Sequence, residues 1–162
     1  PLHFLKEAMG QPWPCGFVRL ALSGLPFASH YRYGQSIARA ADALGRRVGL
    51  VASGDLSHYL ARQGPYGFRK EGPVYDSQVM DILARAAFDE LLSMDPQLCE
   101  KAGECGQRSF LILAGFLDGL AVTAQALSHE GVTGVGYGVV TFLPQSGDPG
   151  RHFLEGGFPH EP

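Results

Sequence analysis

The stretch Val48-Gly49-Leu50-Val51-Ala52, followed by Ser53-Gly54-Asp55-Leu56-Ser57-His58, says most about the fold of this chain. An apolar run that ends abruptly in Ser-Gly-Asp predicts a buried strand that delivers the next residues to the carboxyl edge of a sheet. Open α/β proteins bind their ligands at that edge. Asp55 and His58 are therefore the first candidates for a functional role.

The composition is that of one ordinary globular domain. The chain has 162 residues, of which 45% are apolar and 18% are charged, and this length can bury one core. The formal net charge is -3, and Lys and Arg do not cluster along the sequence. This charge pattern argues against nucleic acid or an anionic membrane as a partner. A small, uncharged or mildly polar partner is favoured.

Cysteine usage and the ends of the sequence bear on the cellular setting. Cys15, Cys99 and Cys105 are an odd number at irregular spacing, so neither a disulfide framework nor a zinc knuckle is expected, and a reducing cytoplasm fits best. No apolar run approaches the ~20 residues that span a bilayer, and the N-terminus lacks the order of a secretory signal. Because the chain opens on Pro1, we expect it to be a processed or truncated piece of a longer protein.

The first half of the chain predicts a strand, helix and strand in that order. Residues 17–23 and 47–52 have strand-like apolar runs, and residues 34–45 carry apolar side chains at helical spacing before Gly45. A βαβ unit places its strands in parallel with a right-handed crossover. We therefore expect an α/β fold with a mixed, partly parallel sheet.

The second half predicts four helices and two further strands. Helices are expected at 76–87, 88–94, 96–102 and 109–117, the last of them apolar nearly all round and therefore central. Residues 121–128 and 135–143 are β-like and can extend the sheet as an antiparallel pair. From 144 to 162 the chain is rich in Gly and Pro, so we expect a tail or linker after a domain that ends at residue 143.

His58 is the leading candidate for proton transfer. An imidazole at a strand edge can act as an acid or base near neutral pH, because its ordinary pKa is ~6.5, and Asp55 can fix the ring or the nearby backbone. The alternative is that Asp55 or Ser57 caps a short helix on which His58 is merely exposed. The aromatic loop at 64–68 follows closely and is either part of a pocket wall or an ordinary surface loop.

Glu104 and Cys105 precede the central helix and lie between two glycines. The positive end of the helix dipole is expected to lower the pKa of the thiol and to favour the charged carboxylate, and either group can bind a metal. The alternative is that Glu104 complements the helix N-terminus and Cys105 is a small buried apolar residue. Arg108 can clamp an anion or pair with Glu104 at i, i+4, and the pair is the favoured alternative. His129 and His152 have no partner at metal-ligand spacing and are expected to be structural or exposed.

Five ordered motifs carry a resemblance to a known family. They lie at 51–58 (Val-Ala-Ser-Gly-Asp-Leu-Ser-His), 64–68 (Gly-Pro-Tyr-Gly-Phe), 72–76, 103–109 (Gly-Glu-Cys-Gly-Gln-Arg-Ser) and 134–137. Through them, roughly residues 1–143 resemble the B-subunit family of class III extradiol ring-cleavage dioxygenases, which includes the beta subunit of protocatechuate 4,5-dioxygenase, and the related Memo proteins.

The resemblance implies a three-layer α/β/α domain with non-haem Fe(II) held by two N-terminal histidines and a later carboxylate. It matches His58 to the acid-base residue, Glu104 to the carboxylate ligand, and Cys105 to the cysteine that the Memo branch presents. Its implied substrate is a small aromatic diol whose hydroxyls chelate Fe(II), with Asp55 orienting His58. The two histidine ligands would precede Pro1, so the facial triad is incomplete here and iron affinity should be weak.

Two other functions are weighed against the dioxygenase. One is a non-catalytic, Memo-like module that binds a metal or another protein. The other is a metal-free hydrolase that uses His58 and Asp55, but it lacks a nucleophile at a credible spacing. A homo-oligomer or a fused second domain is compatible with either of the main alternatives.

Overall fold

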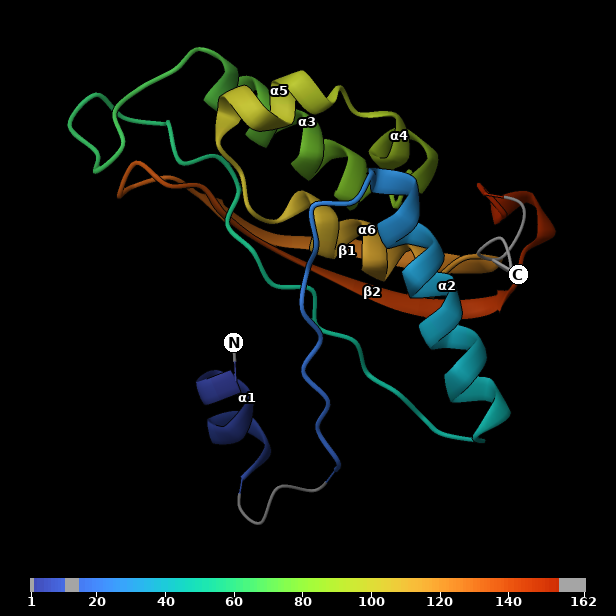
Figure 1. Cartoon of the computed structure of the whole chain (residues 1–162). Coiled ribbons are helices and arrows are strands. Elements are labelled where there is room, and N and C mark those ends of the chain that lie inside the picture. Colours follow the sequence, from blue (N-terminus) through green and yellow to red (C-terminus); the bar gives the residue numbers. More distant parts are fainter. Residues whose placement is uncertain (1, 11–14, 155–162) are drawn as a thin grey trace.

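The protein is described here by a computed structural model that covers residues 2–10 and 15–154, and its elements follow one another as helices and then a hairpin (Figure 1). The elements are α1 (Leu2–Met9), α2 (Phe27–Ala43), α3 (Glu71–Ala84), α4 (Phe88–Ser93), α5 (Pro96–Ala102), α6 (Gln107–Phe116), β1 (Leu120–Glu130), β2 (Tyr137–Gly147) and the 3-10 turn η1 (Pro149–Arg151). Within the described residues, no helix combines the length and apolar character needed to cross a membrane.

The sheet is an antiparallel hairpin of β1 and β2. Ala124 pairs with Phe142 and Glu130 pairs with Tyr137, and an irregularity shifts the register between Ala126 and Ser128. Side chains on one face of the hairpin pack against the buried helical core, which includes Tyr75, Val79, Phe88 and Leu111. The helices therefore cover one face of the hairpin, and the antiparallel pair expected from the sequence is confirmed.

The helix termini follow the local sequence. Asp95 accepts a hydrogen bond from the backbone nitrogen of Gln97 at 2.9 Å, Pro96 occupies the first turn, and Gly103 ends α5 with φ at 64°. These are the residue types that start and stop helices. The helices expected at 88–94 and 96–102 are confirmed to within a residue. By contrast, α2 begins directly after Pro26, well before the expected start at residue 34.

Two glycines bring α2 and α6 into backbone contact. A Cβ at Gly34 would lie 2.7 Å from the backbone nitrogen of Phe116, and a Cβ at Gly115 would lie 2.8 Å from the carbonyl carbon of Tyr31. Since real Cβ atoms do not approach backbone so closely, both positions require glycine. This crossing fixes α6, and with it the loop that leads into α6, against the N-terminal half of the chain.

The parallel part of the expected sheet is not observed. Residues 17–23 and 47–52 run through Figure 1 without regular structure, and in the described part of the chain neither segment pairs with a strand. Val18 is 79% exposed and Val51 is 58% exposed. The fold is mixed α/β, but its sheet is antiparallel and the described residues do not confirm the three-layer arrangement. The physical reason is that a strand pattern specifies an extended chain, whereas a strand also needs a hydrogen-bonding neighbour.

The chain after β2 is held by Asp118. Its carboxylate accepts hydrogen bonds from the Tyr31 hydroxyl at 2.5 Å, Gln35 Nε2 at 3.0 Å, His152 Nδ1 at 2.8 Å and the backbone nitrogen of Phe153 at 3.2 Å. These bonds hold the pKa of Asp118 below its usual value even though burial works in the opposite direction. The tail expected from residue 144 therefore begins within β2 and stays bound to the fold through residue 154, and its remainder lies outside the described residues.

Candidate functional site

The candidate site forms where the 53–58 segment crosses the loop before α6. A Cβ at Gly54 would lie 2.7 Å from the Cys105 carbonyl oxygen and 2.8 Å from the Gly106 nitrogen. The backbone nitrogen of Asp55 donates to Cys105 Sγ at 3.1 Å, and the backbone nitrogen of Cys105 donates to the Asp55 carbonyl at 3.3 Å. Ser109 Oγ donates to the Ser53 carbonyl at 3.0 Å. Two segments about fifty residues apart are thereby fixed side by side.

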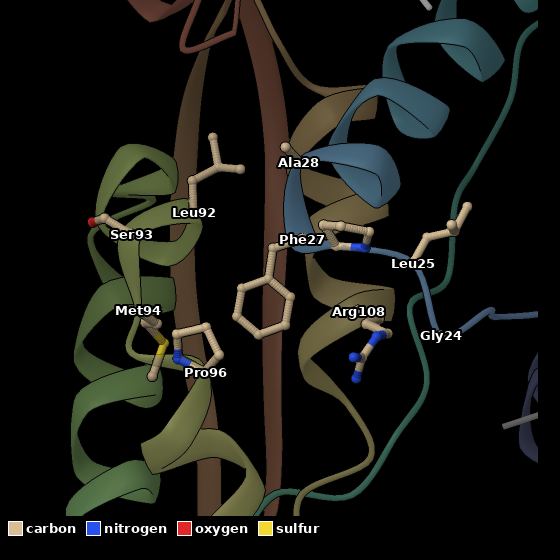
Figure 2. Close-up of a pocket in the computed structure, with 10 residues that line it drawn as sticks. Gly24, Leu25, Phe27, Ala28, Leu92, Ser93, Met94, Pro96 and Arg108 are labelled. Carbon is tan, nitrogen blue, oxygen red and sulfur yellow. The ribbon is translucent and has the colours of Figure 1, made fainter.

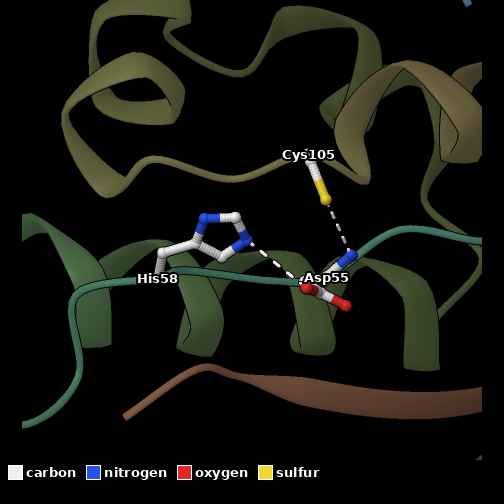
Figure 3. Close-up of side chains that lie close together, drawn as sticks. All are labelled: Asp55, His58 and Cys105. Atoms are coloured by element: carbon white, nitrogen blue, oxygen red, sulfur yellow. Dashed lines mark hydrogen bonds and ion pairs between the residues drawn. The ribbon is translucent and has the colours of Figure 1, made fainter. Parts of the chain in front are cut away.

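Asp55, His58 and Cys105 point toward one another at this crossing (Figure 3). One ligand atom from each residue lies within 4.8 Å of the other two, and His58 Nε2 is 3.5 Å from Asp55 Oδ2. His58 Nε2 is buried and has no hydrogen-bond partner among the described residues. A buried imidazole nitrogen that faces a carboxylate and a thiol suits a divalent cation with mixed nitrogen, oxygen and sulfur ligands.

A buried serine and aspartate hold the segment that carries His58. The fully buried Ser57 donates its backbone N–H to Asp76 Oδ1 at 2.7 Å and its hydroxyl to the Ala102 carbonyl at 2.8 Å. Asp76 Oδ2 lies 3.2 Å from His129 Nε2. Burial raises the pKa of Asp76, and its bonds to Ser57 and His129 oppose the rise. The supporting roles of Asp76 and His129 were missed from the sequence, although Asp76 closes one of the five motifs.

This network excludes the alternative in which a helix begins at Asp55 or Ser57. Between α2 and α3, the described residues form turns and a single bridge between Leu60 and Phe68. Ser57 Oγ instead accepts from the backbone nitrogen of Tyr59 at 3.0 Å. The serine therefore shapes a tight loop, which turns His58 toward α6.

The aromatic loop at 64–68 contacts His58 directly. The Tyr66 ring stacks on the His58 ring with centroids 5.1 Å apart and planes inclined by 22°, and Tyr59 meets Tyr66 edge to face at 6.5 Å. Gly64 lies against the backbone of Gly134, which leaves space for only a hydrogen at the contact. The loop thus forms one wall of the site, while Tyr66 keeps 58% of its surface exposed.

The thiol of Cys105 behaves differently from the expectation. Its pKa is raised, first by partial desolvation and then by the Asp55 and Glu104 carboxylates, and the hydrogen bond from the Asp55 nitrogen only partly offsets this. The expected lowering of its pKa is therefore wrong for this geometry, because partial burial and the neighbouring Asp55 and Glu104 carboxylates raise the pKa. A cation would have to displace the thiol proton in order to bind.

Glu104 takes the structural role that was weighed as the alternative. Its Oε2 accepts a hydrogen bond from the backbone nitrogen of Gln107 at 2.6 Å, at the start of α6. Burial raises its pKa. Glu104 stands outside the group formed by Asp55, His58 and Cys105. The expected ion pair with Arg108 is also absent from the salt bridges of the described residues, because the carboxylate is turned to the backbone.

The fold and the site together define a mixed α/β domain whose candidate centre gathers an imidazole, a carboxylate and a thiol around the N-terminus of a buried helix. Residues 1–140 match the family described as the catalytic LigB subunit of aromatic ring-opening dioxygenase. The chain belongs to this family, which confirms the resemblance carried by the five motifs.

A curated relative of this chain is a longer protein. The chain is 33% identical over 151 residues to Protein CA_C1420 of Clostridium acetobutylicum, an alignment that covers 93% of this chain and 32% of that protein. The chain therefore spans about a third of the length of this relative.

The described residues do not assemble two histidines with a carboxylate. His30 contacts Ser23 Oγ and the Pro26 carbonyl, while His129 and His152 bond to buried aspartates away from Cys105. His58 is thus the one imidazole in the metal-suited group. The donor set found here fits a divalent cation in general and differs from the facial triad expected for Fe(II).

Proposed function

We propose that this chain contributes the proton-transfer side of a metal-dependent site that opens small aromatic diols with dioxygen. The observation that supports the proposal is the convergence of His58, Asp55 and Cys105, with His58 Nε2 buried and without a hydrogen bond among the described residues. Membership of the ring-opening dioxygenase family gives the reaction class. Because the chain spans about a third of its curated relative, the proposal concerns the longer protein.

Each side chain of the candidate site has its own role in this proposal. His58 takes a proton from a diol hydroxyl and returns it during ring opening, and Asp55, whose Oδ2 is 3.5 Å from His58 Nε2, orients the ring and stabilises its charged form. Tyr66 keeps the imidazole plane in place by stacking and shields one of its faces from water. Cys105 is the preferred metal-side residue, since Glu104 is bonded to the start of α6. The metal, Fe(II) or another divalent cation, supplies Lewis acidity and redox chemistry when it is bound.

Turnover by the full-length protein tests this proposal. Fe(II) is loaded without oxygen, a panel of catechols is added, and oxygen uptake and ring-cleavage absorbance are followed. His58→Gln should lower the rate by about 100-fold or more while metal content stays the same, because general acid-base catalysis contributes at least that much. His3→Gln, which changes an exposed histidine, is the matched control. A metal-loaded full-length protein that turns over none of the catechols would refute the proposal.

A second function is favoured by one specific observation. Cys105, and not Glu104, joins His58 and Asp55, and a thiol with an imidazole and a carboxylate can hold a metal without oxygen chemistry. In such a metal-binding or protein-interaction module His58 is itself a ligand. Metal titration separates the two functions. In the metal-binding module both His58→Gln and Cys105→Ser should lose the metal, whereas in the dioxygenase His58→Gln should keep it. The free cysteines fit a reducing cytoplasm for either function.

A further inference from the structure

A hollow of about 500 Å³ opens between the start of α2 and the connection from α4 to α5 (Figure 2). Its lining comes from residues 24–28, from Leu92, Ser93, Met94 and Pro96, and from Arg108 on α6. Ligand pockets commonly enclose about 300 to 1,000 Å³ and have mostly apolar walls with a few polar groups. The volume of this hollow falls in that range and most of its lining is apolar, although the hollow is open to solvent.

Arg108 is the one charged residue of this lining. Its guanidinium carbon lies 5.6 Å from the centre of the Phe27 ring, and its Nε is buried without a hydrogen-bond partner in the described part of the chain. Glu104, four residues earlier, is bonded to the Gln107 nitrogen and makes no ion pair with Arg108. Arg108 makes no salt bridge among the described residues, and its guanidinium, which lines the hollow, can pair with an anionic ligand there.

The remaining walls specify the rest of the ligand. Phe27 and Met94 offer an aromatic face and a polarisable thioether, both of which pack well on an aromatic ring (Figure 2). A phosphate group would need several donors, whereas the lining offers a single guanidinium and the first N–H of α6 is bonded to Glu104. One planar, singly charged carboxylate matches the fork of one arginine.

We propose that this hollow binds a small aromatic monocarboxylate, with the carboxylate on Arg108 and the aromatic body between Phe27 and Met94. This binding uses none of Asp55, His58 or Cys105, so it does not depend on ring opening or on a metal. Arg108 lies three residues after Cys105 in the sequence, and the lining of the hollow shares no residue with the candidate metal centre.

Binding of 3-phenylpropionate tests the proposal, with the neutral 3-phenylpropionamide as the matched ligand. Isothermal titration of the metal-free chain should show that the acid binds about tenfold or more tightly than the amide, the ratio that a lost charged hydrogen bond produces. Arg108→Met should weaken binding of the acid by a similar factor and leave binding of the amide unchanged. Arg47→Met, which changes an exposed arginine outside the hollow, should alter the affinity for neither compound.

Three results would overturn the proposal. The first is equal affinity for the acid and the amide, and the second is that Arg108→Met binds the acid as tightly as the unaltered chain. The third is no binding of the acid at concentrations up to about 10 mM, since a specific site would bind more tightly than that. The comparison of acid with amide uses the unaltered chain, so it decides the question even where Arg108→Met fails to fold. Failure of ring cleavage leaves these outcomes untouched, because no catechol or metal is present.

Discussion

Gly54→Ala should loosen the crossing that assembles the candidate site. The added methyl would lie 2.7 Å from the Cys105 carbonyl oxygen and 2.8 Å from the Gly106 nitrogen, and both are backbone atoms that no rotamer change can move. Ordinary contacts begin near 3.4 Å, so the two segments must separate by more than half an ångström. Overpacking of this kind costs about 1 to 3 kcal/mol. For a chain of this size, that cost lowers the melting temperature by about 2 to 10 °C.

Gly49→Ala is the matched control, because a methyl there meets nothing within 4 Å. Thermal unfolding of the two variants compares the same chemical change at a crowded position and at an open one. Separation should also weaken the hydrogen bond from the Asp55 nitrogen to Cys105 Sγ. Equal melting temperatures for the two variants would refute the reasoning, since the crossing would then tolerate a methyl group.

Three further predictions concern single side chains. Asp118→Asn should lower the free energy of unfolding in urea by about 2 kcal/mol at pH 7, because a buried charged acceptor is lost. The pKa of Asp118 is depressed in the folded state, so this stabilisation is complete above pH ~4 and disappears as the pH falls through the folded pKa. An undiminished difference between the two proteins at pH 2 would contradict this account. Tyr66→Ala should shift the ring resonances of His58 in NMR spectra, whereas Tyr66→Phe should preserve them because the stack remains. In the metal-free chain with Cys15 replaced by Ser, alkylation of Cys105 should stay slow at neutral pH and accelerate only above the usual thiol range, because its pKa is raised; fast labelling at pH 7 would argue otherwise.

Local sequence signals predicted the second half of the fold well. Asp95 and Pro96 start α5 and Gly103 ends it, and these signals act within a few residues, so they hold whatever the rest of the chain does. The hairpin of β1 and β2 is also local, since its two strands are neighbours in sequence. The expected strands at 17–23 and 47–52 failed because their pairing depends on a distant partner, which no pattern within either segment can specify.

The sequence named Asp55, His58, Glu104 and Cys105 as candidates, by motif order and by an expected strand edge that does not form. The structure brings Asp55, His58 and Cys105 together. The sequence could not decide whether Glu104 or Cys105 faces the candidate metal site, because the two residues are adjacent in the same motif. The backbone geometry before α6 decides which side chain turns toward Asp55 and His58. The supporting role of Asp76 depends on the folded approach of α3 to Ser57, which spacing alone does not show.

The two extended segments also affect how the chain behaves in concentrated solution. Residues 17–23 and 47–52 expose apolar side chains such as Val18 and Val51, and their backbones have no strand partner in the described part of the chain. Such segments resemble open sheet edges, which recruit strands from other molecules and seed aggregates. The stretches with the clearest strand patterns are therefore surfaces at which copies of this chain can associate.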